Sequence, residues 1–127
     1  MTTKSEIVPE YILRALLHVV GDKVRINDGR GLNDILDEAA DKYPELFESL
    51  RAHPQYHHSE KLQHTLFLLK LGGNITYEGL SRYFTISKTL AGGYGYCLLS
   101  SFSIDQKIAI RDVAAKIRSV SPPKLRP

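Results

Sequence analysis

The sequence predicts a mostly α-helical fold in one small domain, and three observations support this prediction. Apolar residues recur at helical spacing in several segments. Residues that cap helices precede some of these segments, and glycine or proline stands where they end. The chain has 127 residues, enough for a single core that buries about two-thirds of the unfolded surface. We therefore expect a small helical bundle over residues 1–120, with a short β-hairpin as a further element and a flexible, basic, proline-rich tail over 121–127.

The N-terminal half predicts helices separated by one short strand and a turn. Pro9 suits the first turn of a helix and Gly21 suits its end. Tyr43 precedes Pro44 and is pushed away from helical geometry, so one helix ends there and the next begins. The predicted elements are helices over 9–20, 33–42 and 44–51, a strand over 23–26 and a turn over 28–31.

The stretch 59–102 holds the densest apolar run. Ser59 is the expected N-cap of a helix over 60–71, which Gly72 and Gly73 end. Beyond it, two readings compete. The favoured one places helices over 76–84 and from Lys88 onward, while the other reads 74–77, 83–87 and 94–102 as strands because Tyr, Phe, Thr and Ile are strand formers.

The last helix has the clearest beginning in the chain. Ser103 and Gln106 have the spacing of a capping box, in which each side chain bonds the backbone of the other residue. Ile110, Val113 and Ile117 continue an apolar stripe along this helix. We expect it to span 103–119 and to pack on the core.

Residues 76–90, TYEGLSRYFTISKTL, resemble the helix-turn-helix of repressors and homeodomain-like transposase modules. Ser81 matches the small residue of the first helix, Ile86 the apolar turn residue and Ser87 the cap of the recognition helix. The chain has Thr85 at the turn glycine of that family, and Gly92 and Gly93 shorten the recognition helix. So short a helix reads few bases alone, which implies weak specificity or a homodimer.

The resemblance implies a small DNA-binding protein of transcription regulation. The start of the recognition helix would face base edges, the preceding helix would reach phosphates, and basic residues near the C-terminus would extend the contact. The residues expected at the nucleic acid are Tyr77, Arg82, Ser87, Lys88, Thr89, Lys116 and Arg118.

The charge distribution favours the same function. Residues 1–50 carry six basic and ten acidic residues, a net charge of −4, whereas residues 51–127 carry eleven and four, a net charge of +7. Phosphate contacts supply much of the affinity of DNA-binding proteins. The half with the motif therefore has the charge that a nucleic-acid interface requires, although a basic solvated face is the simpler interpretation.

A second function class is a small protein–protein interaction module, such as an adaptor, immunity or inhibitor protein. Tyr94 and Tyr96 in GGYGY would be its contact residues, since Tyr flanked by Gly is common at contact surfaces. No membrane partner is expected.

A third class is a metal-dependent enzyme. Its only support is His57, Glu60 and His64, which would share one helical face. Ser59 as N-cap leaves His57 outside the helix, and no HExxH pattern occurs. We therefore expect no metal, no cofactor and no catalytic residues.

Cys97 is the only cysteine, which excludes an internal disulfide and suits a reducing compartment. Its apolar neighbours predict a buried, inert thiol. No apolar run is long enough to span a bilayer, and the N-terminus lacks a signal pattern. We expect a cytoplasmic protein.

Overall fold

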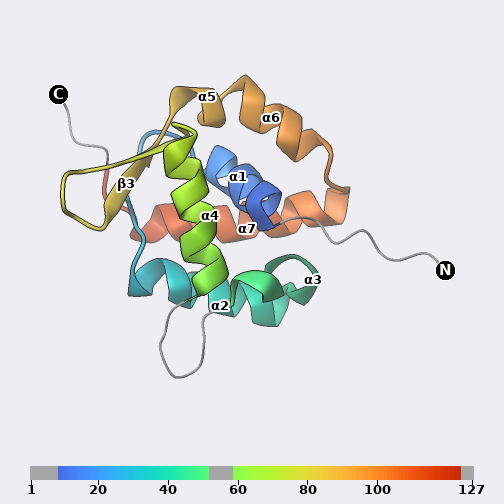
Figure 1. Ribbon diagram of the computed structural model, residues 1–127. Coiled ribbons are helices and arrows are strands. Elements are labelled where there is room, and N and C mark those ends of the chain that lie inside the picture. Colours follow the sequence, from blue (N-terminus) through green and yellow to red (C-terminus); the bar gives the residue numbers. More distant parts are fainter. Residues whose placement is uncertain (1–8, 52–58, 124–127) are drawn as a thin grey trace.

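A computed structural model describes residues 9–51 and 59–123. These residues form a mostly helical domain with a small three-stranded antiparallel sheet, which confirms the predicted fold class (Figure 1). The elements are α1 (Pro9–Val20), β1 (Ile26–Asn27), α2 (Arg30–Lys42), α3 (Pro44–Phe47), the 3₁₀ helix η1 (Glu48–Leu50), α4 (Glu60–Leu71), β2 (Ile75–Tyr77), β3 (Tyr83–Ile86), α5 (Lys88–Ala91), α6 (Gly93–Ser100) and α7 (Ile104–Val120).

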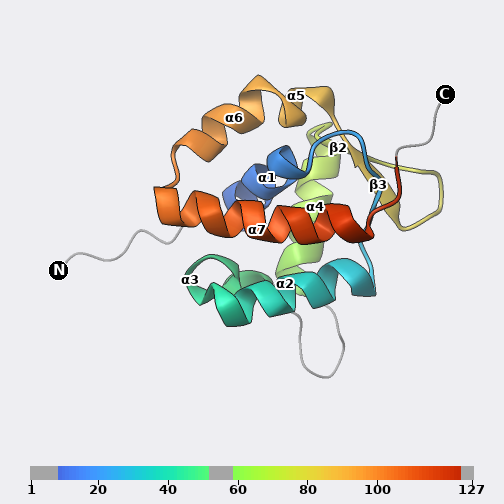
Figure 2. The same cartoon turned by 180° about the vertical axis from the view of Figure 1, so that it is seen from behind.

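Helix α1 is the centre of the fold. It contacts α7, α6, α5, α4 and α3, and the other elements surround it in both ribbon views (Figures 1 and 2). Leu13, Ala15, Leu16 and Leu17 are fully buried, as expected of a helix covered on several sides. In Figure 1 α4 lies in front of α7, and in Figure 2, which is seen from behind, α7 lies in front of α4.

The sheet has the strand order β1-β3-β2. Ile26 of β1 pairs with Phe84 of β3, and Ile75 of β2 pairs with Ile86 of β3. Phe84 and Ile86 are buried while Tyr83 and Thr85 are partly exposed, which is the alternation of a strand with one face on the core.

The predicted helix over 76–84 is wrong. Residues 75–77 and 83–86 are strands of a hairpin, and Gly79 in the connecting turn has a positive φ of 55°. The segment 76–90 therefore lacks the first helix of a helix-turn-helix. The strand reading holds for these two segments, but 94–102 is not a strand because 93–100 form α6.

The predicted caps are confirmed. Ser59 Oγ accepts a hydrogen bond from Leu62 N, and Ser103 and Gln106 form both bonds of the capping box. Ser87 Oγ accepts from Leu90 N at the start of α5, but α5 has only four residues.

The boundaries of other segments also differ from the prediction. The strand expected over 23–26 is Ile26–Asn27, and the helix expected over 44–51 consists of α3 and η1. Helix α2 begins at Arg30, within the predicted turn. At the other end of the chain, Pro122 O accepts a hydrogen bond from Arg25 N, and Val24 pairs with Pro123. The described part of the predicted tail is thus attached to the strand region, and residues 124–127 lie outside the described residues.

Candidate nucleic-acid interface

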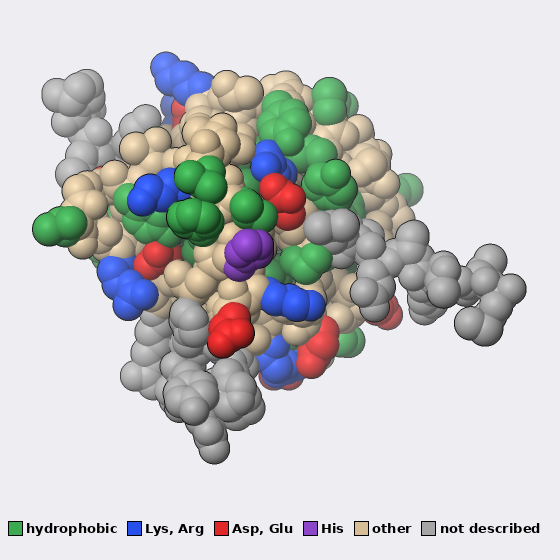
Figure 3. All heavy atoms as spheres, in the orientation of Figure 1, with side chains coloured by type: hydrophobic (Ala, Val, Ile, Leu, Met, Phe, Trp, Pro, Cys, Tyr) green, Lys and Arg blue, Asp and Glu red, His purple; other side chains and the backbone are tan. Residues whose placement is uncertain are grey.

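Helix α4 has one face in the core and one face in solvent. Leu62, Thr65, Leu66 and Leu69 are buried, because residues three and four apart share a helix face. The opposite face is visible in Figure 3, where hydrophobic side chains gather over α4 and charges of both signs surround them.

The outward face of α4 changes character along its length. Its first half is polar, with Glu60, Lys61 and His64 exposed and Gln63 partly exposed. Its second half exposes Lys70 and three large apolar residues: Phe67 is 53% exposed, Leu68 36% and Leu71 68%. Scattered exposed apolar residues are normal, but three on one helix face form a patch.

A groove of about 460 Å³ lies between the first turn of α1 and residues 60–68 of α4. Its lining combines charged and apolar groups from the two helices: Pro9, Glu10, Glu60, Lys61, His64, Thr65 and Leu68. The groove continues the apolar patch through Leu68, so the two form one surface.

The hairpin is fixed beside α4 by the buried carboxylate of Asp28, which precedes α2. Tyr77 Oη donates to Asp28 Oδ2 at 2.6 Å, and Arg82 Nε donates to Asp28 Oδ1 at 3.1 Å. Gln63 Nε2 of α4 donates to the Asp28 carbonyl oxygen at 3.4 Å. We call these four residues the Asp28 cluster. The cluster joins three parts of the fold: the residues before α2, the β2–β3 hairpin and α4.

Burial and the hydrogen bond to Asp28 raise the pKa of Tyr77 above its ordinary value. The Tyr77 ring also packs on Phe84, with centroids 5.5 Å apart, and Lys70 Nζ lies 5.6 Å from the Tyr77 centroid. Tyr77 is therefore a support of the hairpin, and its hydroxyl is already bonded within the protein.

Arg82 closes the hairpin turn and remains accessible. Its side chain is 67% exposed although Nε is bonded to Asp28. Arg25, which precedes β1, also contacts the hairpin. Its Nε binds Glu78 Oε2 at 2.8 Å, and its guanidinium lies 4.5 Å from the Tyr83 ring centroid. Of the residues predicted at DNA, Arg82 is the one that extends from the hairpin turn.

The remaining predicted contacts are divided between two other places. Lys88 and Thr89 are exposed on α5, at the top of Figure 1, where Ser87 serves as cap. Lys116 and Arg118 lie on α7, which is behind α4 in that view; Lys116 Nζ is 4.0 Å from Glu38 Oε2, and Arg118 donates to Val19 O. The structure does not bring these residues together with Arg82 around a recognition helix.

Tyr94 and Tyr96 lie two positions apart on α6 and so face different directions. The Tyr94 hydroxyl accepts from Arg14 at 2.8 Å, whereas the Tyr96 ring meets His18 edge-on. Both side chains remain exposed, Tyr94 to 42% and Tyr96 to 66%. The prediction of a buried Cys97 is wrong, since its helical position leaves the thiol exposed.

His57 lies outside the described residues. Within residues 9–51 and 59–123, no group of three His, Cys, Asp or Glu side chains is placed to hold a metal ion. Glu60 and His64 occupy the outward face of α4. In the same ranges, no helix is long and apolar enough to cross a membrane.

The site contains residues that sequence reasoning did not select. Lys61 and Gln63 follow the Ser59 cap, so the sequence places them in the first turn of a helix. Whether each side chain faces outward or inward depends on which side of that helix α1 covers. From the sequence, Asp28 was predicted only as part of a turn. Its partners Tyr77 and Arg82 lie 49 and 54 positions further on.

In comparisons with known proteins, no protein-family model, no curated protein and no solved structure matches the chain.

Proposed function

We propose that this protein binds duplex DNA with α4 and with the hairpin turn 78–82. The observation that carries the proposal is the order of elements: α1, β1, α2, the short helices α3 and η1, and α4 are followed directly by the hairpin, with strand order β1-β3-β2. This is the order of a winged helix-turn-helix, with α2 and α4 as the helix pair and the hairpin as the wing. The proposal keeps the predicted function and replaces the segment 76–90 as its motif.

In this arrangement the first half of α4 enters the major groove, since recognition helices contact bases through their N-terminal residues. The ammonium group of Lys61 suits the acceptors of guanine. Gln63 is already bonded to the Asp28 carbonyl oxygen and serves to hold the hairpin beside α4. Glu60 is the opposing feature, because its carboxylate repels phosphates.

The wing supplies a phosphate contact. Arg82 is exposed at the turn, and the Asp28 cluster holds that turn at a defined position relative to α4. A side chain whose backbone is fixed loses less conformational entropy on binding. Because the surface around α4 carries both charge signs, we expect non-specific dissociation constants on the order of 10⁻⁴–10⁻⁶ M at physiological salt.

A salt-dependent titration of a fluorescent duplex tests the proposal. Arg82→Ala should reduce the slope of log affinity against log salt by about 0.9, the value for one lost phosphate contact. Lys61→Ala should cost roughly 1–3 kcal/mol and relax the preference at one base position. Arg111→Ala is the matched control, because Arg111 is exposed on α7, which Figure 2 shows on the side away from α4.

The proposal fails if the wild-type protein shows no duplex binding at low salt, where electrostatic attraction is strongest. It also fails if Arg111→Ala weakens binding as much as Arg82→Ala does, since binding would then follow net charge alone.

The apolar half of α4 favours protein binding as a second candidate function. Phe67, Leu68 and Leu71 with the adjoining groove offer a surface for an amphipathic partner helix. Phe67→Lys should abolish such binding while the circular dichroism spectrum stays unchanged, because the side chain is already half exposed. Loss of partner binding without any change in DNA affinity would separate the two functions.

A further inference from the structure

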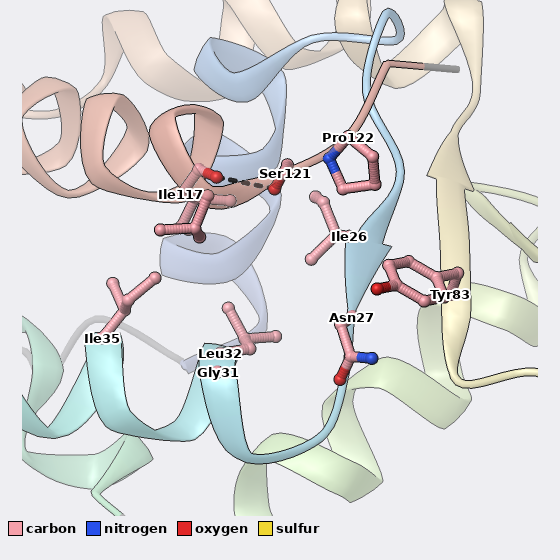
Figure 4. A pocket seen from close by; sticks show the side chains of 10 residues that line it. Ile26, Asn27, Gly31, Leu32, Ile35, Tyr83, Ile117, Ser121 and Pro122 are labelled. Atoms are coloured by element: carbon pink, nitrogen blue, oxygen red, sulfur yellow. Dashed lines mark hydrogen bonds between the residues drawn. The ribbon is translucent and has the colours of Figure 1, made fainter. Parts of the chain in front are cut away.

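A cavity of about 130 Å³ lies between α2, α7 and β1, away from the outward face of α4 (Figure 4). Ile26, Leu32 and Ile117 form its apolar walls and are almost fully buried. In Figure 4, Leu32 and Ile35 point into the space from α2, and Ile117 points toward it from α7.

The mouth of the cavity carries three polar side chains. The Tyr83 hydroxyl is turned toward Ile26 and Asn27. Asn27 Oδ1 already accepts from Gly29 N, and Ser121 Oγ donates to Ile117 O. Among the described residues, the Tyr83 hydroxyl and Asn27 Nδ2 have no hydrogen-bond partner, so both remain able to bind a ligand.

The size and chemistry of the cavity define a ligand class. An apolar cavity of about 150 Å³ binds benzene, and this one, at about 130 Å³, is close to the size that holds a six-membered ring. Binding sites for small molecules combine apolar walls with a few placed polar groups. We propose that the cavity binds a monocyclic compound carrying one hydroxyl group, with the ring against Ile26, Leu32 and Ile117 and the hydroxyl at Tyr83 and Asn27.

The probe is phenol, compared with benzene, in NMR titrations that follow the side-chain methyl groups. Phenol should shift the methyl signals of Ile26, Leu32 and Ile117 with a dissociation constant on the order of 1 mM, as expected of seven heavy atoms. Tyr83→Phe should weaken phenol binding about two- to tenfold, the value of one neutral hydrogen bond, and leave benzene binding unchanged.

Gly31 allows the cavity to be filled without harm to the fold. It lines the cavity, and a Cβ added there would meet no atom within 4 Å. Gly31→Leu should weaken binding of both probes at least tenfold, whereas Gly31→Ala should retain it. Both variants should remain folded, because either residue favours a helix more than glycine does.

Three results would overturn the inference. The first is that phenol leaves the three methyl signals in place while others shift without saturation, which is non-specific partitioning. Equal loss of phenol and benzene binding in Tyr83→Phe would remove the hydroxyl contact. Unchanged binding in a folded Gly31→Leu variant would place the ligand elsewhere.

Discussion

Tyr77→Phe removes one hydroxyl from the Asp28 cluster and leaves the aromatic ring against Phe84. The lost bond joins Tyr77 Oη to a carboxylate that is 6% exposed, at 2.6 Å. A hydrogen bond to a charged group contributes about 1.5–3 kcal/mol, and Asp28 keeps its bond from Arg82. We expect a loss of about 2 kcal/mol in the free energy of unfolding, or roughly 6–10 °C in Tm for a chain of this size.

Urea denaturation followed by circular dichroism measures this loss. Tyr96→Phe is the control: Tyr96 is 66% exposed, so its variant should stay within about 0.5 kcal/mol of wild type. In the double variant with Asp28→Asn, the two losses should not add, because both changes break the same bond. Equal stability of Tyr77→Phe and Tyr96→Phe would refute the reasoning that the cluster fixes the hairpin.

Three further predictions concern stability. Burial and the bond to Asp28 raise the pKa of Tyr77. The contribution of the Tyr77 hydroxyl to stability is therefore fully present below about pH 10 and is lost as the pH rises further. Between about pH 9 and 11, Tm should fall more in wild type than in Tyr77→Phe. Gly95→Ala should destabilise the fold by roughly 3 kcal/mol or more, since the added Cβ would overlap Leu90 O and the His18 side chain. Gly93→Ala is the control: its Cβ would meet nothing within 4 Å, so it should be neutral or stabilising in the same thermal melts. Ser103→Ala should cost about 1 kcal/mol in urea denaturation through loss of the capping box.

Helices with local signals were predictable from the sequence. Ser59 and Ser103 cap the helices that they were expected to cap, and Pro9 begins α1. In each case the signal lies within a few residues of the boundary that it determines, so no knowledge of the tertiary structure was needed.

The hairpin was not predictable in the same way. Leu80, Tyr83 and Phe84 fit a helical face by spacing, yet Leu80 is fully exposed in the turn and Phe84 is buried by pairing with Ile26. That pairing partner lies 58 positions earlier, so the tertiary context overrode the local pattern.

Helix α6 shows a similar limit. Glycine lowers helix propensity, so Gly92 and Gly93 were expected to interrupt the helix that begins at Lys88. Helix α5 does end at Gly92, but a second helix, α6, begins at Gly93. In the structure, Gly95 is buried and allows α6 to approach Leu90 O and His18 of α1 closely. The glycine is used for packing, and a single sequence carries no sign of that contact.

The location of the DNA is the central claim, and NMR shift mapping with a short duplex at low salt tests it most directly. We predict that backbone amide signals of 59–70 and 78–82 shift together and saturate, while those of α5 and of the outward side of α7 stay in place. Shifts centred on Lys88 and Thr89 of α5, or on Lys116 and Arg118 of α7, with α4 unchanged, would contradict the account.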